Sequence, residues 1–301
     1  MEELFRVQAP EGPADFDVFW QRRHARALSI DHGSKMIDTG REKSGWRVFD
    51  WAYQSTDGVL IRGWVLQPAN NRAVRALVIG HGYGGRTEPD FDLPYENAVL
   101  AFPCARGLGK SLHPCLSPDS RWHVLHHIHS REDYVLGGCV DDTWLAVSAL
   151  LSHFPECEGR VGYTGSSFGG GIGVLALASD QRVARAHLHV PSFGNHPLRL
   201  RLPSVGSAAS VQAFLPQCPS LIGVLAYYDA AVAARRVHIP VHCACAMFDP
   251  AVAPAGQFSI FNALSGKKEL FVLSAGHHVH PGQRDEELRL RQDLKKFFRD
   301  L

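Results

Sequence analysis

Hydrophobic residues recur along this chain in two different spacings, which predict helices in some segments and strands in others. Residues 14–28 mix aromatic and charged residues at helical spacing and predict an amphipathic helix near the N-terminus. Residues 46–54 and 59–67 are rich in β-branched and aromatic residues, and the Thr-Asp-Gly turn at 56–58 is a hairpin signal. The chain is therefore expected to begin with a helix and an antiparallel pair of strands.

After residue 70, short apolar runs alternate with longer amphipathic segments. The amphipathic segments predict helices at about 141–154, directly after residue 167, and at 285–299. Buried strands are expected at residues 76–79, 98–102, 161–164, 186–190, 241–247 and 269–273. This alternation favours an α/β fold, with a mostly parallel sheet flanked by helices on both faces. Ligands of such sheets bind at the carboxyl ends of the strands.

The chain of 301 residues shows no linker, repeat or low-complexity segment, so residues 1–301 are expected to form a single domain. Residues 191–234 break the alternation of strands and helices. Four prolines lie between Pro191 and Pro216. We therefore expect residues 191–234 to form a small cap insertion over the functional site.

Composition narrows the class of protein. Hydrophobic residues make up 45% and charged residues 20%, and the formal net charge of +1 gives no reason to expect nucleic-acid or membrane partners. The N-terminus lacks the apolar stretch of a secretory signal, and no run approaches the roughly 18 apolar residues of a membrane-spanning helix. The seven cysteines have no paired spacing, which predicts reduced thiols and a cytoplasmic location. We expect no cofactor and no metal.

The most informative motif is a Gly-x-Ser-x-Gly turn between a predicted strand and a predicted helix. Ser167 stands at its centre, with Gly165 and Gly169 on either side. This is the pattern of a nucleophile elbow, in which small neighbours let the backbone turn sharply and leave the serine projecting above the sheet. A plain turn between strand and helix is the alternative. The strand–turn–helix context favours Ser167 as the nucleophile of an α/β-hydrolase.

A serine nucleophile needs a histidine base and a carboxylate that orients it, and in α/β-hydrolases the chain order is serine, acid, histidine. Asp249 ends the strand predicted at 241–247 and precedes Pro250, which forbids strand continuation. Asp229 is the alternative acid, but its place before a helical stretch is typical of a helix start. Asp249 is therefore the predicted acid.

The base is expected in the loop after the last predicted strand. There, His277 directly follows Gly276, and His278 and His280 are the alternatives. The chain holds 17 histidines, so position in the fold, and not residue type, favours His277.

Hydrolysis of an ester also requires two backbone donors for the developing oxyanion. One is the N–H of Phe168, the residue after the nucleophile. The other is assigned to Tyr83, in the glycine-rich loop that follows the strand at 76–79. A flexible connector is the alternative reading of that loop. We expect the rings of Phe168 and Tyr83 to wall a narrow acyl site.

Together these segments resemble a known family, the acetyl xylan esterases and cephalosporin C deacetylases of carbohydrate esterase family seven. The family pattern holds an Arg-Gly-Gln element, a Gly-x-Ser-Gln-Gly elbow and a His-Glu pair. The matching segments here are Arg106-Gly107-Leu108, Gly165-Ser166-Ser167-Phe168-Gly169 and His277-His278. Further similarity lies at residues 15–20, 81–83, 227–229, 248–250, 253–254 and 261–262.

The resemblance implies that Arg106 and Gly107, with the two elbow glycines, support the site structurally. Each family triplet departs at one position, because Leu108 and Phe168 replace glutamines and His278 replaces a glutamate. The resemblance also implies a homo-oligomer, a hexamer built as a trimer of dimers. Its contacts would involve residues 113–131, which are rich in histidine.

The sequence thus predicts a serine esterase that removes short acyl groups, acetyl above all, from sugars or related alcohols. A dienelactone-hydrolase-like or peptidase-like serine hydrolase is the alternative enzyme, because a fold does not fix a substrate. A binding protein that kept the fold and lost turnover is the alternative from another class.

Overall fold

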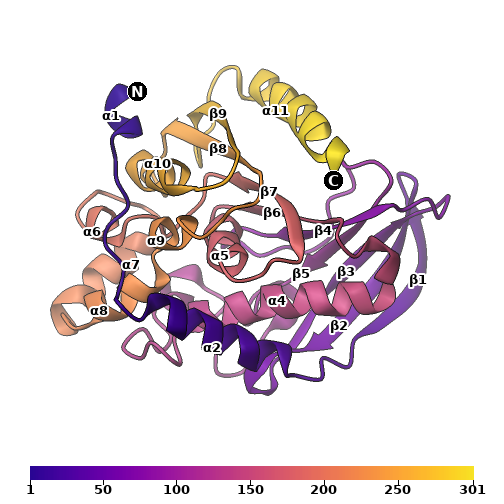
Figure 1. The fold of residues 1–301 in the computed structure, drawn as a ribbon, viewed down its shortest axis with the longest axis horizontal. Helices are drawn as coiled ribbons and strands as arrows, with labels where there is room; N and C mark the ends of the chain where they lie inside the picture. Colours follow the sequence, from indigo (N-terminus) through magenta and orange to yellow (C-terminus); the bar gives the residue numbers. More distant parts are fainter.

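The computed structural model describes residues 1–301, and its strands form one nine-stranded sheet (Figure 1). The strands lie side by side in the order β1-β2-β3-β5-β4-β6-β7-β8-β9. Their bounds are β1 (Lys35–Lys43), β2 (Trp46–Gln54), β3 (Leu60–Pro68), β4 (Arg75–Gly80), β5 (Ala98–Pro103), β6 (Val161–Ser166), β7 (Val183–His189), β8 (Val241–Phe248) and β9 (Lys268–Ala275).

Eleven α-helices surround the sheet or connect its strands. Their bounds are α1 (Glu2–Phe5), α2 (Phe16–Leu28), α3 (Ser120–His123), α4 (Val135–His153), α5 (Phe168–Leu177), α6 (His196–Arg199), α7 (Ser207–Phe214), α8 (Leu221–Leu225), α9 (Ala230–Ala234), α10 (Pro254–Ala263) and α11 (Gln283–Phe297).

Strand pairing changes direction once along the sheet. The strands β1, β2 and β3 pair antiparallel, and β3 also pairs antiparallel with β5. From β5 through β4, β6, β7 and β8 to β9, every pairing is parallel. The carboxyl ends of these six strands therefore meet at one edge of the sheet. The predicted fold class, a mostly parallel sheet flanked by helices, is confirmed.

The two faces of the sheet are covered unequally. Helices α2, α4, α5 and α9 contribute to a core of 59 buried residues, whereas α11 closes a core of 18. Alternate residues of β4 enter different cores: Ala76 and Val78 the larger one, Leu77 and Ile79 the smaller one. Figure 1 shows α11 on the opposite side of the strands from α2 and α4.

Strand β1 and the start of α4 differ from the sequence-based expectation. The strand β1 is almost wholly exposed and mostly polar, so it lacks the apolar alternation that marks a half-buried strand. Helix α4 begins at Val135, six residues before the predicted start, because Gly137 and Gly138 lower the helical signal there. Helix α4 is long and apolar enough to span a membrane by length and composition alone, yet 78% of its most apolar window is buried inside the fold.

Residues 191–234, the predicted cap segment, contain the short helices α6 to α9. Its last helix, α9, packs against α5 and α10, so this end of the segment belongs to the main core. Helix α7 packs against α3. The Asp229 side chain caps α9 by accepting from backbone N–H groups of Ala231 and Val232, as expected of a helix-start residue.

Candidate active site

Ser167 lies in the turn between β6 and α5, in a backbone conformation that side chains rarely adopt. Its φ is 52° and its ψ is −109°. Its N–H donates to the carbonyl oxygen of His189 over 2.8 Å, which fixes the turn against β7. A Cβ atom on Gly165 would lie 2.4 Å from the carbonyl oxygen of Gly169, and one on Gly169 would lie 2.7 Å from that of His81. Both elbow glycines are therefore required by close backbone packing.

A line of hydrogen bonds joins Ser167 to the two residues predicted as its partners. Ser167 Oγ lies 3.0 Å from His277 Nε2, and His277 Nδ1 lies 2.8 Å from Asp249 Oδ2. These distances fit one tautomer, in which Nδ1–H donates to Asp249 and Nε2 accepts from the serine hydroxyl. His277 has a φ of 47°, so it too sits in the left-handed region.

The Asp249 carboxylate is fully buried, and four groups donate to it or lie within hydrogen-bonding distance. Oδ1 accepts from the N–H groups of Ala251 and Val252, both over 2.9 Å. Oδ2 accepts from the Gln257 amide over 3.1 Å as well as facing His277. This set of hydrogen bonds fixes the orientation of the carboxylate toward His277.

Two neighbours of the site were missed by the sequence analysis. Gln257 lies on α10, holds Asp249 through its amide nitrogen, and accepts from the N–H of Ala246 over 2.8 Å. Ser192 lies with its Oγ 3.4 Å from Ser167 Oγ, and its N–H donates to the Ser167 carbonyl. No motif marks either residue, because each reaches the site only through the packing of distant segments.

The alternative acid and bases lie elsewhere in the hydrogen-bond network. The Asp229 carboxylate accepts from backbone N–H groups around α6 and α9, and burial raises its pKa to about 6. The ring of His278 packs edge-on against Phe248, and His280 lies 3.4 Å from the Glu286 carboxylate. Of the three histidines considered, the structure brings His277 to Ser167 and Asp249.

The backbone N–H groups of Phe168 and Tyr83 have no acceptor within the protein. The first is the leading N–H of α5, at the positive end of the helix dipole. The second follows Gly82, where an added Cβ would lie 3.9 Å from the Cβ of Ser167. Two free donors thus flank the serine hydroxyl.

The Phe168 ring lies deeper than the sequence suggested. It is only 2% exposed and stacks under Tyr83 with ring centroids 4.3 Å apart. Phe193 meets it edge-on at 6.0 Å. The sequence led us to expect the Phe168 ring at the open mouth of the site. That expectation is wrong for this ring, because it is buried. Tyr83 lies between it and the exterior.

Arg106 is buried and holds together three parts of the chain. Its guanidinium and its backbone N–H both bind Asp142 on α4, and Nη2 also donates to Ser55 and Thr56 of the β2–β3 turn. Burial alone would lower the pKa of this guanidinium, but the Asp142 carboxylate raises it above its ordinary value. Gly138 of α4 leaves the necessary room, because a Cβ there would lie 2.2 Å from the guanidinium.

His123 joins the loop that holds Arg106 to the loop that holds Tyr83. His123 Nε2 donates to the Arg106 carbonyl oxygen over 2.9 Å, which leaves Nδ1 to accept from the Tyr83 hydroxyl at 3.3 Å. Gly107, with a φ of 78°, passes close to the His123 ring. Leu108 is buried in the larger core. One of the clustered histidines of residues 113–131 is thus a buried contact of the site's supporting loops.

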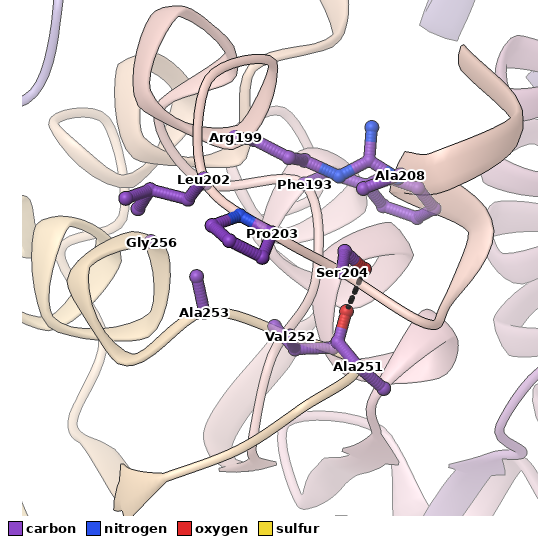
Figure 2. Close-up of a pocket in the computed structure, with 11 residues that line it drawn as sticks. Phe193, Arg199, Leu202, Pro203, Ser204, Ala208, Ala251, Val252, Ala253 and Gly256 are labelled. Atoms are coloured by element: carbon purple, nitrogen blue, oxygen red, sulfur yellow. Dashed lines mark hydrogen bonds between the residues drawn. The ribbon is translucent and has the colours of Figure 1, made fainter. Parts of the chain in front are cut away.

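A small cavity lies between the predicted cap segment and the loop that follows Asp249 (Figure 2). Its volume is about 20 Å³, and Phe193, Ala251 and Val252 are among its lining residues. Figure 2 shows the Arg199 side chain lying along the Phe193 ring, and its guanidinium carbon is 5.2 Å from the ring centroid. The cavity has room for about one water-sized group.

A serine in such a turn, with a histidine and an aspartate from the ends of later parallel strands aligned on it, is the arrangement of an α/β-hydrolase. The chain belongs to the acetyl xylan esterase family, because the family model Acetyl xylan esterase (AXE1) matches residues 2–294. Membership of that family makes the protein a carboxylic ester hydrolase.

Solved structures share the fold of this chain. The chain superposes on an acetyl xylan esterase from Paenibacillus sp. R4 with a TM-score of 0.82 and 19% identity, covering 97% of this chain and 99% of that one. The acetyl xylan esterase 1 of Thermoanaerobacterium sp. JW/SL YS485 gives 0.81 and 19%, covering 98% of each chain. An acylaminoacyl peptidase from Pyrococcus horikoshii gives 0.65 and 13%, covering 84% of this chain and 41% of that one.

Proposed function

We propose that this protein is a serine esterase that hydrolyses short-chain acyl esters, acetyl esters first, of sugars or related alcohols. The observation that carries the proposal is the line of hydrogen bonds from Ser167 through His277 to Asp249, with two unpaired backbone N–H groups beside the serine. The family and the names of the two acetyl xylan esterases of similar fold support acetyl as the acyl group.

In the first half-reaction, Ser167 Oγ attacks the ester carbonyl carbon while His277 Nε2 takes the hydroxyl proton. The negative charge that develops on the carbonyl oxygen is stabilised by the N–H groups of Phe168 and Tyr83. Asp249 keeps the His277 tautomer and stabilises the imidazolium that forms. The C–O bond to the alcohol then breaks, and His277 gives its proton to the departing alkoxide.

In the second half-reaction, a water takes the place of the alcohol. His277 accepts a proton from this water as its oxygen attacks the acyl-enzyme carbonyl, and the same two N–H groups hold the second oxyanion. Collapse of the intermediate returns the proton to Ser167 Oγ and releases the acid.

The preference for short acyl groups rests on the space beside Tyr83. The ring of Phe193 faces the Tyr83 ring at 6.5 Å and lines the small cavity of Figure 2. The rings of Tyr83, Phe168 and Phe193 pack together next to the elbow, so a methyl group has more room there than a long acyl chain.

Two measurements test the proposal. Purified protein should hydrolyse p-nitrophenyl acetate and react with a fluorophosphonate probe, and both activities should be lost in Ser167→Ala. Removal of a triad nucleophile typically costs about 10⁴- to 10⁶-fold in rate. Ser265→Ala, on an exposed residue away from the site, is the matched control.

The same panel separates the competing functions. A protein that cleaves peptide anilides faster than acetyl esters would be peptidase-like, and one that reacts with neither substrate nor probe would be a binding protein. If Ser167→Ala keeps its circular dichroism spectrum and more than a few per cent of activity, the nucleophile is another residue.

A further inference from the structure

Ser192 is a buried serine whose hydroxyl group meets the nucleophile. It lies in the loop that follows β7, is 6% exposed, and has its Oγ 3.4 Å from Ser167 Oγ. This contact is the one hydrogen bond that the Ser192 hydroxyl makes with another residue. Because a buried hydroxyl group without a partner is costly, the hydroxyl of Ser192 is expected to point at Ser167.

The hydrogen bonds of His277 determine which of the two serines donates. The Asp249 carboxylate accepts from Nδ1–H of His277, so Nε2 carries a lone pair and accepts from the Ser167 hydroxyl. A hydroxyl group has a single hydrogen, and that of Ser167 is taken by His277. The Ser192 hydroxyl must therefore be the donor in the contact between the serines, and Ser167 Oγ the acceptor.

The backbone holds Ser192 beside the nucleophile from two sides. The N–H of Ser192 donates to the carbonyl oxygen of Ser167 over 3.0 Å, and the N–H of Ser167 donates to that of His189 over 2.8 Å. On the other side, a Cβ atom on Gly171 of α5 would lie 2.3 Å from the Ser192 carbonyl oxygen. These contacts involve only backbone atoms, so a change of the Ser192 side chain leaves them in place.

The loop around Ser192 adopts a strained backbone conformation. Val190 has a φ of 41° and Phe193 a φ of 66°. Positive φ is uncommon for any residue with a side chain and rarest for β-branched or bulky ones. Strain of this kind persists only where the surrounding structure imposes it, and it clusters at active sites. Here the strained residues flank Ser192, the part of the loop that faces the nucleophile.

The hydrogen bond from Ser192 is expected to strengthen during the reaction. In the resting enzyme Ser167 Oγ is a neutral oxygen, and 3.4 Å is long for a hydrogen bond between two hydroxyl groups. Negative charge develops on this oxygen as His277 takes its proton. A hydrogen bond to a charged oxygen is shorter and about twice as strong as one to a neutral oxygen. An interaction that is stronger in the transition state than before it raises the rate.

We propose that Ser192 is a further catalytic residue, whose hydroxyl group donates a hydrogen bond to Ser167 Oγ when this oxygen gains negative charge. This happens when Ser167 attacks the ester, and again when its Oγ leaves the acyl carbon in the second half-reaction. Ser192 keeps its own proton throughout, since His277 accepts and returns the proton that moves. The inference rests on the proposed function and adds to it a second side chain, after His277, that contacts the reacting oxygen.

The first test compares two variants with side chains of the same size. Ser192→Thr keeps the hydroxyl group, whereas Ser192→Val has a methyl group in its place, and both keep the backbone N–H that binds Ser167. For p-nitrophenyl acetate, kcat of Ser192→Thr should exceed that of Ser192→Val by about ten-fold or more. KM should change little, because both half-reactions are slowed. Equal kcat values would overturn the proposal.

The second test follows the attack of Ser167 by itself. A fluorophosphonate probe forms a stable adduct on the nucleophile, so its rate of labelling reports attack without a later hydrolysis. Ser192→Val should be labelled more slowly than Ser192→Thr by about ten-fold or more. A purely structural role of the side chain would instead lower the melting temperature and leave the two labelling rates equal, and that result would also overturn the proposal.

A smaller variant covers the case in which the added methyl groups prevent folding. Ser192→Ala removes only the hydroxyl group, and its kcat and labelling rate should both lie about ten-fold or more below those of the unmodified enzyme. Ser265→Ala, the same change on an exposed serine, should leave both rates unchanged.

The esterase function and the role of Ser192 fail in different ways. An unmodified enzyme that reacts with neither the ester nor the probe contradicts the esterase function itself. An active enzyme whose rates do not depend on the Ser192 hydroxyl leaves the esterase standing and removes Ser192 from the reaction.

Discussion

Gln257 donates to the same oxygen of Asp249, Oδ2, that faces Nδ1 of His277. The amide lies 3.1 Å from this oxygen and the imidazole 2.8 Å. The other end of the same amide accepts from the N–H of Ala246 in β8, and Nε2 also donates to the Val252 carbonyl. The carboxylate is thus held from both sides, and its orientation toward His277 depends on a residue of α10.

Gln257→Met should therefore weaken catalysis without touching the reacting atoms. Loss of this donor leaves the carboxylate free to turn away from His277, so kcat should fall by about ten-fold or more while KM changes little. The unpaired N–H of Ala246 should lower the free energy of unfolding by about 1–3 kcal/mol. A purely structural role for Gln257 predicts the loss of stability without the fall in kcat at a temperature where the variant stays folded.

His277→Ala should behave like Ser167→Ala, with a loss of about 10⁴-fold or more in kcat for p-nitrophenyl acetate. His278→Ala should keep measurable activity, because its ring packs on Phe248 and forms no hydrogen bond to Ser167 or Asp249. Steady-state kinetics on both variants decides between them. The base assignment moves by one residue if His278→Ala is the more damaging change.

Acyl length should have a sharp effect on kcat/KM. We expect the highest values for acetyl and propionyl esters and a fall of about ten-fold or more by octanoyl, because the packed rings of Tyr83, Phe168 and Phe193 leave little room. A series of p-nitrophenyl esters from acetyl to octanoyl measures this. An enzyme that prefers octanoyl to acetyl would be a lipase-like esterase instead.

Phe168→Gln, which installs the residue of the resembling family, should act mainly on stability. The amide would enter a buried cluster of rings in which both nitrogens of His81 and of His123 already have partners. We expect the free energy of unfolding to fall by about 1–3 kcal/mol. Phe168→Leu, which keeps the site apolar, should be more stable than Phe168→Gln by urea denaturation, and the reverse order would mean that the amide finds partners.

Acidification from pH 7 to pH 5 should destabilise the fold. Burial lowers the pKa of His81 and His123 to about 4 and that of His196 to about 3, whereas unfolded histidine titrates near 6.5. Between these values the unfolded chain binds protons that the folded chain does not, so the stability present above pH 6.5 is lost as the pH falls. Each of the three contributes about 2 kcal/mol of this loss at pH 5.

Urea unfolding at pH 7, 6 and 5 measures the effect, and His123→Gln should reduce the pH dependence. Asp229 works in the opposite direction, because its raised pKa favours the folded state below about pH 6. The three histidines together have a larger effect than Asp229, so the net result is a loss of stability at low pH. Equal stability at pH 7 and pH 5 would mean that these imidazoles become protonated without unfolding.

Most elements of the fold are visible in the sequence, because buried strands and amphipathic helices carry periodic apolar residues. The strand β1 is not, since an exposed edge strand has no face that must be apolar. Helix α10 was also not predicted, because its buried residues include the polar side chains of Gln257 and Ser259. Polar residues that are buried because they are hydrogen-bonded give no hydrophobic signal.

The residues of the candidate site also fall into those that the sequence reveals and those that it does not. Ser167, Asp249 and His277 can be chosen from the sequence because each stands at the end of a predicted strand. Gln257 and Ser192 cannot be chosen in this way. They are far from Ser167 in the sequence and come near the site only when the chain folds. The direction of the Phe168 ring was equally hidden, since the sequence places its backbone at the elbow but not its side chain under Tyr83.

The positive φ angles of Ser167 and His277 place the two reacting side chains but lower the stability of the folded protein. A non-glycine residue held in such a conformation typically costs about 1–3 kcal/mol, and here two of them stand in hydrogen-bonding contact. Glycine at either position would relax the backbone and remove the reacting group. Natural selection for turnover and selection for a robust chain therefore pull in opposite directions at these two residues, and improvements in thermal resistance must come from elsewhere in the molecule.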